Sequence, residues 1–235
     1  MSHSQAITTL TGRLADRINE REQSKHAVKM LAQIERLESQ AIAFEKVRAA
    51  RNPVDTTAAH SRKVAMAATR LRAESEKIRD KINEIMTNGM REVEQEIATQ
   101  AGMIEGEYSG EIRAAFRGMT EKERADTLLS ALREGNSEII AAIGLAPAIL
   151  SGVKPEEQQR TVEAIRKMKA PALIQESEDI SEAFETAQAV FQVADTMFND
   201  NYNYAEQAAI DRAERETAEA EAALTQSIET AAQSS

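Results

Sequence analysis

Three histidines, His3, His26 and His60, are the side chains best suited to acid–base chemistry or metal binding near neutral pH. None of them lies in a His-x-x-x-His, Glu-x-x-His or His-Glu-x-x-His spacing, which would place two ligands on one face of a helix. Glu22 precedes His26 by four residues and so shares its helical face. We interpret that pair as an exposed ion pair, and we expect no metal site.

Other reactive groups and phosphate-binding loops are missing from the sequence. The chain contains no cysteine, which excludes disulfides, thiolate catalysis and Cys-ligated metals. It has no Gly-x-x-x-x-Gly-Lys-Ser/Thr loop, no Gly-x-Gly-x-x-Gly after a strand and no Gly-x-Ser-x-Gly turn. The carboxylates are interspersed with basic residues along helical faces, which is typical of solvated surfaces. We therefore expect no enzymatic activity and no cofactor.

The densest polar and aromatic cluster is Asn-Asp-Asn-Tyr-Asn-Tyr at residues 199–204. A calcium loop starting at Asn199 would lack glycine at its sixth position and would carry Ile210 in place of the bidentate glutamate. Because Asn and Asp are poor helix formers, the segment instead predicts a kink or a contact patch in a helix. Aromatic residues are otherwise rare, so those near this cluster are candidate interaction residues: Phe184, Phe191, Phe198, Tyr202 and Tyr204.

Basic residues gather in the first part of the chain and acidic residues in the last. Residues 1–90 hold 16 Lys and Arg against 11 Asp and Glu, whereas residues 171–235 hold 2 against 14. The asymmetry is compatible with head-to-tail self-association, with neutralisation within the chain, or with nucleic-acid contact at the basic end. Interspersed acids and the lack of aromatic stacking groups weaken the nucleic-acid alternative. The candidate interaction residues at the basic end are Arg48, Arg51, Arg62 and Lys63.

Helical periodicity dominates the sequence, and nothing reads as a strand. From about Ser4 to Arg51, apolar residues recur every three or four positions, which predicts one helix that Asn52-Pro53 ends. The stretch 17–27 is poor in apolar residues and should be the most exposed or mobile part of that helix. A second helix is predicted over 57–104, with a heptad-like seam and a stutter between Ile82 and Met90. The simplest arrangement is an antiparallel hairpin that turns near 52–56, and two splayed helices are the alternative.

The rest of the chain predicts short helices and then one long one. Glycines break up the sequence after residue 101, and Thr120 with Glu123 forms a capping-box pattern. The apolar run Ile139–Leu150 is interrupted by glycine and proline, and its twelve residues are too few to span a bilayer. From Ala172 onward the chain has no glycine or proline, which predicts a long acidic helix whose end frays.

The sequence thus predicts an all-α fold: a long hairpin of coiled-coil-like helices (1–105), a small multi-helix module (106–171) and a long acidic C-terminal helix (172–235). Helices of about 48 residues cannot bury their apolar stripes against so small a module, so neighbouring helices must cover them. We expect a non-enzymatic structural or assembly protein that oligomerises with copies of itself or with other structural proteins. The alternatives are an adaptor that presents residues 119–169 to a partner, or a membrane-active protein that uses 139–150.

Long, Ala- and Glu-rich helices without Cys or Trp are common among assembly and virion proteins of bacterial viruses. A scaffold or virion component is therefore the expectation by class, although this likeness assigns no individual residue. The sequence shows no basic start followed by an apolar stretch, which a signal peptide would need. We expect the protein in the cytoplasm or in a virion assembled there, with no transmembrane helix.

Overall fold

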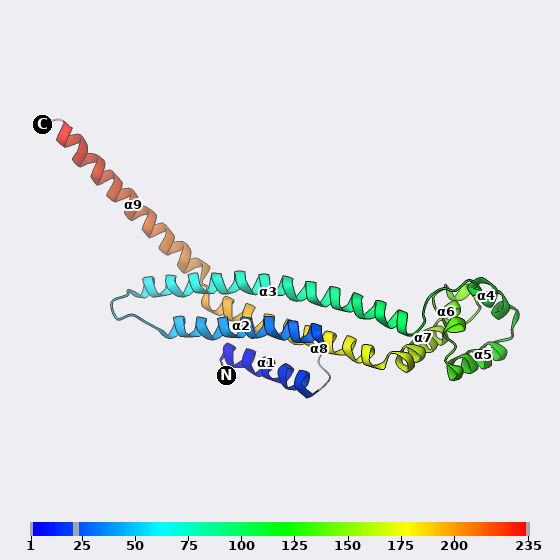
Figure 1. Ribbon diagram of the computed structural model, residues 1–235. Coiled ribbons are helices and arrows are strands. Elements are labelled where there is room, and N and C mark those ends of the chain that lie inside the picture. The colour runs from blue at the N-terminus through cyan, green and yellow to red at the C-terminus, as the bar shows by residue number, and fades with distance from the viewer. Residues whose placement is uncertain (1, 21–23, 234–235) are drawn as a thin grey trace. The chain divides into compact units, whose positions relative to one another are not determined.

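The computed structural model describes residues 2–20 and 24–233, and every regular element within them is a helix (Figure 1). The predicted all-α fold is therefore confirmed for this part of the chain. In chain order, the elements are α1 (His3–Glu20), α2 (Lys25–Ala49), α3 (Thr57–Gln100), α4 (Ser109–Gly118), α5 (Glu121–Glu134), α6 (Ser137–Gly144), the 3₁₀ turn η1 (Ala148–Leu150), α7 (Pro155–Lys169), α8 (Pro171–Asn201) and α9 (Tyr204–Gln233).

Contacts divide the chain into two compact units that each draw on distant stretches of sequence. The division follows packing because α2, α3 and α8 each contribute one part to each unit. The parts predicted from the sequence, 1–105, 106–171 and 172–235, follow chain order instead. Unit 1 takes its residues from 1–23, 28–83 and 183–235, and unit 2 from 24–27 and 84–182.

In unit 1, α1 runs antiparallel to α2 (Figure 1). Ser4 Oγ donates a hydrogen bond of 2.6 Å to Glu45 Oε2, and Thr8 Oγ1 donates one of 2.7 Å to Glu38 Oε1. Residues later in α1 pair with residues earlier in α2, so the two helices run in opposite directions. The apolar face of α1 is buried, as its helical period of three and four predicts: Ile7, Leu14 and Ile18.

The single helix predicted from Ser4 to Arg51 is therefore wrong. α1 ends at Glu20 and α2 begins at Lys25, while residues 21–23 lie outside the described residues. Ser24 Oγ accepts a hydrogen bond of 3.3 Å from the Ala27 backbone N–H, so Ser24 acts as an N-cap for the new helix. The stretch 17–27 was expected to be the most exposed or mobile part, but its described residues Ile18, Ser24, His26 and Ala27 are buried.

The α2–α3 hairpin forms the centre of unit 1. Arg36 Nη2 on α2 donates a hydrogen bond of 2.9 Å to Glu74 Oε2 on α3. Thr56 caps α3, since its hydroxyl accepts from the Ala59 backbone N–H at 3.1 Å. The predicted seam of α3 is buried throughout its unit 1 part, where alternating steps of four and three keep one face inward: Val64, Ala68, Leu71, Ser75, Ile78 and Ile82.

In unit 2, α3 ends earlier than the predicted limit at Ile104. Gly102 adopts a φ of +66°, and the Met103 backbone N–H donates to the Ala98 carbonyl at 2.8 Å, the bond of a Schellman end. The chain therefore leaves the helix direction after Ala101. As a result, Met103 is buried, whereas Ile104, the residue predicted to continue the buried seam of the helix, is exposed.

The short helices of unit 2 enclose two small apolar cores. The first core consists of Ala101, Met103, Ala131, Ile140, Ala141 and Ile165. The second consists of Phe116, Leu128, Ile143 and Val153. The Gln158 side-chain amide joins α7 to the end of α6 by donating to the carbonyls of Ile143, Gly144 and Ala146. It thereby satisfies carbonyls that a helix end leaves without intrahelical partners.

The predicted capping box at the start of α5 is present, with Thr120 and Glu123 each accepting from the other's backbone N–H. The Glu123 carboxylate accepts hydrogen bonds from the Thr120 backbone N–H, which has the larger effect, and from the Thr120 hydroxyl; both lower the pKa of Glu123. The lowered pKa means that the stabilisation is full above the pKa of an unfolded glutamate and is lost as the pH falls through the folded value.

Thr120→Ala should lower the thermal midpoint by a few degrees at neutral pH. The difference from wild type should narrow in acid, and a pH-independent difference would contradict the assignment.

The predicted continuous C-terminal helix is broken within the polar and aromatic cluster. α8 ends at Asn201, whose side-chain amide donates to the Met197 carbonyl at 2.7 Å. α9 begins at Tyr204, and Asn203 Oδ1 accepts from the Glu206 backbone N–H at 3.1 Å. The Asn side chains thus compete with helical hydrogen bonding, which is why this segment interrupts the helix. The frayed end predicted from the sequence includes residues 234–235, which lie outside the described residues.

Candidate interaction surface

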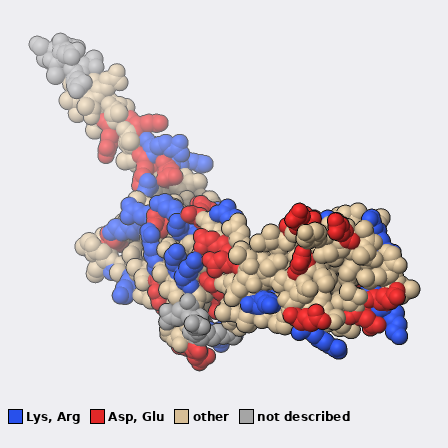
Figure 2. Space-filling model, turned by 45° about the vertical axis from the view of Figure 1, so that its right-hand side comes forward, with Lys and Arg blue, Asp and Glu red and all other residues tan. Residues whose placement is uncertain are grey.

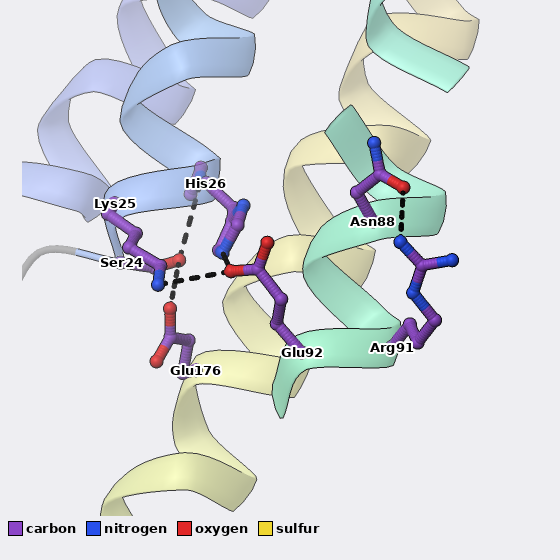
Figure 3. Close-up of polar contacts among 8 residues, drawn as sticks. Ser24, Lys25, His26, Asn88, Arg91, Glu92 and Glu176 are labelled. Atoms are coloured by element: carbon purple, nitrogen blue, oxygen red, sulfur yellow. Dashed lines mark hydrogen bonds and ion pairs between the residues drawn. The ribbon is translucent and has the colours of Figure 1, made fainter. Parts of the chain in front are cut away.

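A polar cluster around His26 joins the start of α2 to α3 and α8 within unit 2 (Figure 3). The imidazole is only 4% exposed, and its Nε2 lies 3.4 Å from Glu92 Oε2. Lys25 Nζ lies 3.2 Å from the same oxygen, and Ser24 Oγ donates to Glu176 Oε1 at 3.4 Å. The hydrogen bond and charge of Glu92 raise the pKa of Lys25. His26 therefore contacts Glu92 of α3 from a buried position, whereas the exposed pair with Glu22 was expected; Glu22 lies outside the described residues.

The His26 ring packs closely on α3. It lies against Gly89, where no side chain separates the ring from the helix backbone. Glu92 also lines a hollow of about 420 Å³ on α3 that Leu173 of α8 borders. The cluster thus fixes the first turn of α2 against α3 and α8 through charge-assisted contacts.

Replacing Gly89 with alanine should destabilise the chain by about 1–3 kcal/mol. The new Cβ would lie 2.8 Å from the Cγ and Nδ1 atoms of His26, closer than real Cβ atoms come, and this clash outweighs the helix propensity that alanine gains. Gly12→Ala is the matched control, because a Cβ there meets nothing within 4 Å and should stabilise α1 by about 0.5–1 kcal/mol. Urea unfolding measures both changes. Equal stabilisation by the two variants would show that His26 does not occupy this position.

A row of aromatic and arginine side chains lies between α3 and α8 in unit 1. Arg72 stacks over the Phe198 ring with its guanidinium carbon 4.8 Å from the centroid, and Arg79 stacks over Phe191 at 4.9 Å. Arg79 also donates to Asp195 at 2.9 Å. Each arginine thus forms a cation–π contact across two antiparallel helices.

The predicted aromatic candidates take different positions in this row. Phe191 and Phe198 are buried, so they join α8 to α3 within the chain. Phe184 is half-buried and borders a surface hollow of about 370 Å³ together with Phe191. Tyr202 stacks on Phe198 at 5.2 Å and meets Tyr204 edge-on at 4.5 Å. Tyr204 is 64% exposed, so the row ends in an aromatic side chain that solvent reaches.

Arg72 and Arg79 were not among the predicted interaction residues, although the sequence holds a signal for them. They are spaced by seven residues, as are Phe191 and Phe198. Two residues seven apart lie on the same face of a helix, so antiparallel packing of two such pairs brings each arginine to one ring.

The predicted basic candidates do not share one partner in the structure. Arg62 Nη1 binds α9 through Asp211 at 3.3 Å and Glu214 at 2.6 Å. Lys63 binds Asp55 at 2.6 Å, and Arg51 donates to the Thr57 hydroxyl at 3.1 Å. Arg48 is exposed near the end of α2. Figure 2 shows Lys and Arg side chains gathered over unit 1 next to the start of α9.

Helix α9 presents most of its surface to solvent. Every described side chain from Ala208 to Ile228 is exposed except Ile210, which is half-exposed. Leu224 and Ile228 are 63% and 61% exposed and lie one turn apart on one face. The N-terminal turns of α9 lie next to the start of α3. A groove of about 440 Å³ separates them, lined by Ala58 and Ala59 of α3 and by Ile210 and Ala213 of α9.

No protein-family model, curated protein or solved structure matches this chain. Within the described ranges, no helix combines the length and apolarity that crossing a bilayer requires. The same residues contain no group of three or more His, Asp or Glu side chains arranged to hold a metal ion.

Proposed function

We propose that this chain is a non-enzymatic structural or assembly protein that oligomerises through its long amphipathic helices. The observation that carries the proposal is the exposure of α9, whose side chains from Asp211 to Ile228 are all exposed to solvent. Helices in proteins draw most of their stability from packing an amphipathic face, and α9 leaves that face uncovered over most of its length.

The pattern of α9 supports a helix–helix contact. Its apolar and small residues recur at steps of three and four, and we name this set the α9 stripe: Ile210, Ala213, Thr217, Ala220, Leu224 and Ile228. Small side chains let a second helix approach closely, while Leu224 and Ile228 supply the apolar area that association would bury. Coiled-coil-like packing of this stripe is part of the proposal.

The charged groups of the chain support a role other than catalysis. The polar clusters described above consist of ion pairs and hydrogen bonds between helices. Within the assembly class we propose a scaffold or virion component of a bacterial virus, located in the cytoplasm or in a virion assembled there. The Cys-free and Trp-free, Ala- and Glu-rich composition supports this assignment.

Leu224→Glu tests the proposal against Ala222→Glu as its matched control. Both variants add one carboxylate to an exposed position of α9, but Ala222 lies on the side of the helix away from the α9 stripe. We expect Leu224→Glu to weaken self-association by about tenfold to a hundredfold, because a buried leucine contributes about 1.5–3 kcal/mol. Ala222→Glu should associate as the wild type does. Equal association of both variants and wild type, in sedimentation velocity, would remove α9 from the interface.

An adaptor that presents residues 119–169 is the second candidate, and one observation favours it. Ile149 is 83% exposed, and its neighbours Leu145 and Leu150 are also exposed in the turn around η1. Such an apolar surface suits a partner protein. The adaptor would be a monomer or a dimer. Ile149→Asp would abolish its partner binding while leaving the unfolding midpoint of the chain unchanged.

A further inference from the structure

We propose that copies of this chain associate head to tail, with the α9 stripe of one copy seated in a groove between α2 and α3 of the next. This inference rests on the proposed function and specifies its interface. The groove has a volume of about 250 Å³ and lies wholly in unit 1. Its apolar lining consists of Ala43, Phe44, Val47, Ala67 and Leu71.

The groove lies on a free face of the hairpin. On α2, Glu38 and Glu45 accept hydrogen bonds from α1, and they point roughly opposite to Ala43 and Val47 at about 100° per residue. On α3, Arg72 and Arg79 contact α8 from a face other than the groove face. Val47 consequently remains 43% exposed although it lies beside buried Phe44.

The rim of the groove is positively charged. Glu74 lines it, but this carboxylate is already paired with Lys77 at 2.6 Å and Arg36 at 2.9 Å. These two partners, Lys77 first, lower the pKa of Glu74. Arg70 also lines the groove and has no ion-pair partner among the residues that the structure describes. Arg36, Arg70 and Lys77 therefore outnumber the single carboxylate Glu74 at this groove.

The α9 stripe carries the complementary charge. Its flanking positions hold Glu214, Glu216 and Glu221, whereas Arg212 and Arg215 project from the opposite side of the helix. α9 as a whole holds seven acidic residues against two arginines. Pairing two stripes with each other would therefore bring glutamates together, whereas the basic rim of the groove neutralises them.

The groove is long enough for the two large apolar residues of the stripe. Leu224 and Ile228 are separated by about 6 Å along α9 at 1.5 Å per residue. The groove is lined on α2 from Gln40 to Val47, which extends over about 10 Å by the same rise. The groove is thus long enough to cover both Leu224 and Ile228.

A second copy fits the groove better than α9 of the same chain. The N-terminal turns of α9 are bound to α3 in two ways. Arg62 forms ion pairs with Asp211 and Glu214, and Gln207 donates a hydrogen bond of 3.4 Å to Ser61. Ser61 and Arg62 lie on the side of α3 away from the groove. The same α9 would have to break these contacts to reach its own groove. Because stripe and groove are different surfaces, the contact is heterologous and each copy can bind two others.

A mixing experiment tests this arrangement in the full-length chain. Leu224→Glu removes the stripe and keeps the groove, whereas Val47→Glu removes the groove and keeps the stripe. Each variant alone should be monomeric, and an equimolar mixture should form a 1:1 heterodimer that grows no further in sedimentation velocity. Ala49→Glu, at an exposed position on another face of α2, is the control for Val47→Glu and should assemble like wild type. Circular dichroism checks that each variant keeps its helix content.

The other outcomes overturn either the stripe–groove interface alone or the proposed function as well. Self-association of Val47→Glu at wild-type strength would mean that stripes pair with each other or with another surface, and the proposed function would stand without this interface. A mixture that stays monomeric would likewise reject the stripe–groove contact. A wild-type chain that is monomeric at every concentration would overturn the proposed function itself, including the case in which α9 covers the groove of its own chain.

Discussion

Replacing Phe191 with alanine should lower the free energy of unfolding by about 3–5 kcal/mol. Phe191 is 5% exposed and carries Arg79 over its ring at 4.9 Å, so truncation leaves a cavity between α3 and α8 and removes a cation–π contact. Urea denaturation followed by far-ultraviolet circular dichroism measures the change. This effect is large because one residue supplies both the apolar contact and the arginine site.

Tyr204→Ala is the control for the Phe191 variant. Tyr204 belongs to the same aromatic row but is 64% exposed, so its loss should cost about 1 kcal/mol or less. If Phe191→Ala unfolded at the same urea concentration as wild type, α8 would not pack on α3 in the described way. Phe191 would then return to the group of residues available to a partner.

Replacing Ile165 with alanine should destabilise unit 2 by about 2–5 kcal/mol. Ile165 is fully buried on α7 and packs in the core with Met103 and Ile140. A core this small has few neighbours that can shift to fill the cavity, so the cost should lie toward the upper end of that range. Thermal unfolding followed by two structural probes would show whether the loss of stability affects only one unfolding transition.

Leu129→Ala is the matched control for that variant. Leu129 lies on the neighbouring helix α5 and is exposed, so its truncation removes little buried area. The two variants delete side chains of similar size from the same unit. Equal destabilisation by both would contradict the core assignment.

Helix boundaries marked by local chemistry could be predicted from the sequence. Asn52-Pro53 follows the end of α2, Thr56 caps the start of α3, and Thr120 with Glu123 defines the start of α5. Gly135 ends α5 in the left-handed conformation, with a φ of +66°. These signals are interpretable because a cap or a proline acts on atoms within one helical turn.

The reversal between α1 and α2 was missed because no strong local signal marks it. No proline or glycine lies between Glu20 and Lys25, and the residues there are mostly compatible with a continuing helix. The reversal is favoured by burial of Ile7, Leu14 and Ile18, which one extended helix would leave without cover. Ser24 was a readable N-cap, but serine is common enough in helices that one residue does not identify a break.

The candidate site was only partly predictable for a related reason. Phe184, Phe191 and Phe198 recur at steps of seven, which places them on one face of α8, but sequence spacing does not show which neighbour covers that face. Arg72 and Arg79 cover Phe198 and Phe191, so part of the expected interaction surface is used within the chain. Whether the groove between α2 and α3 is exposed depends on which face of the hairpin α1 covers. The position of α1 follows from the reversal between α1 and α2, which was not predicted.

Sedimentation velocity of the wild-type chain over a concentration series tests the central claim of self-association most directly. We predict a sedimentation coefficient that rises with concentration, and that falls again when about 0.5 M salt shortens the Debye length to about 4 Å and weakens the contact of acidic α9 with the basic groove. A sedimentation coefficient that stays at the monomer value throughout, with a high frictional ratio, would contradict the assembly function.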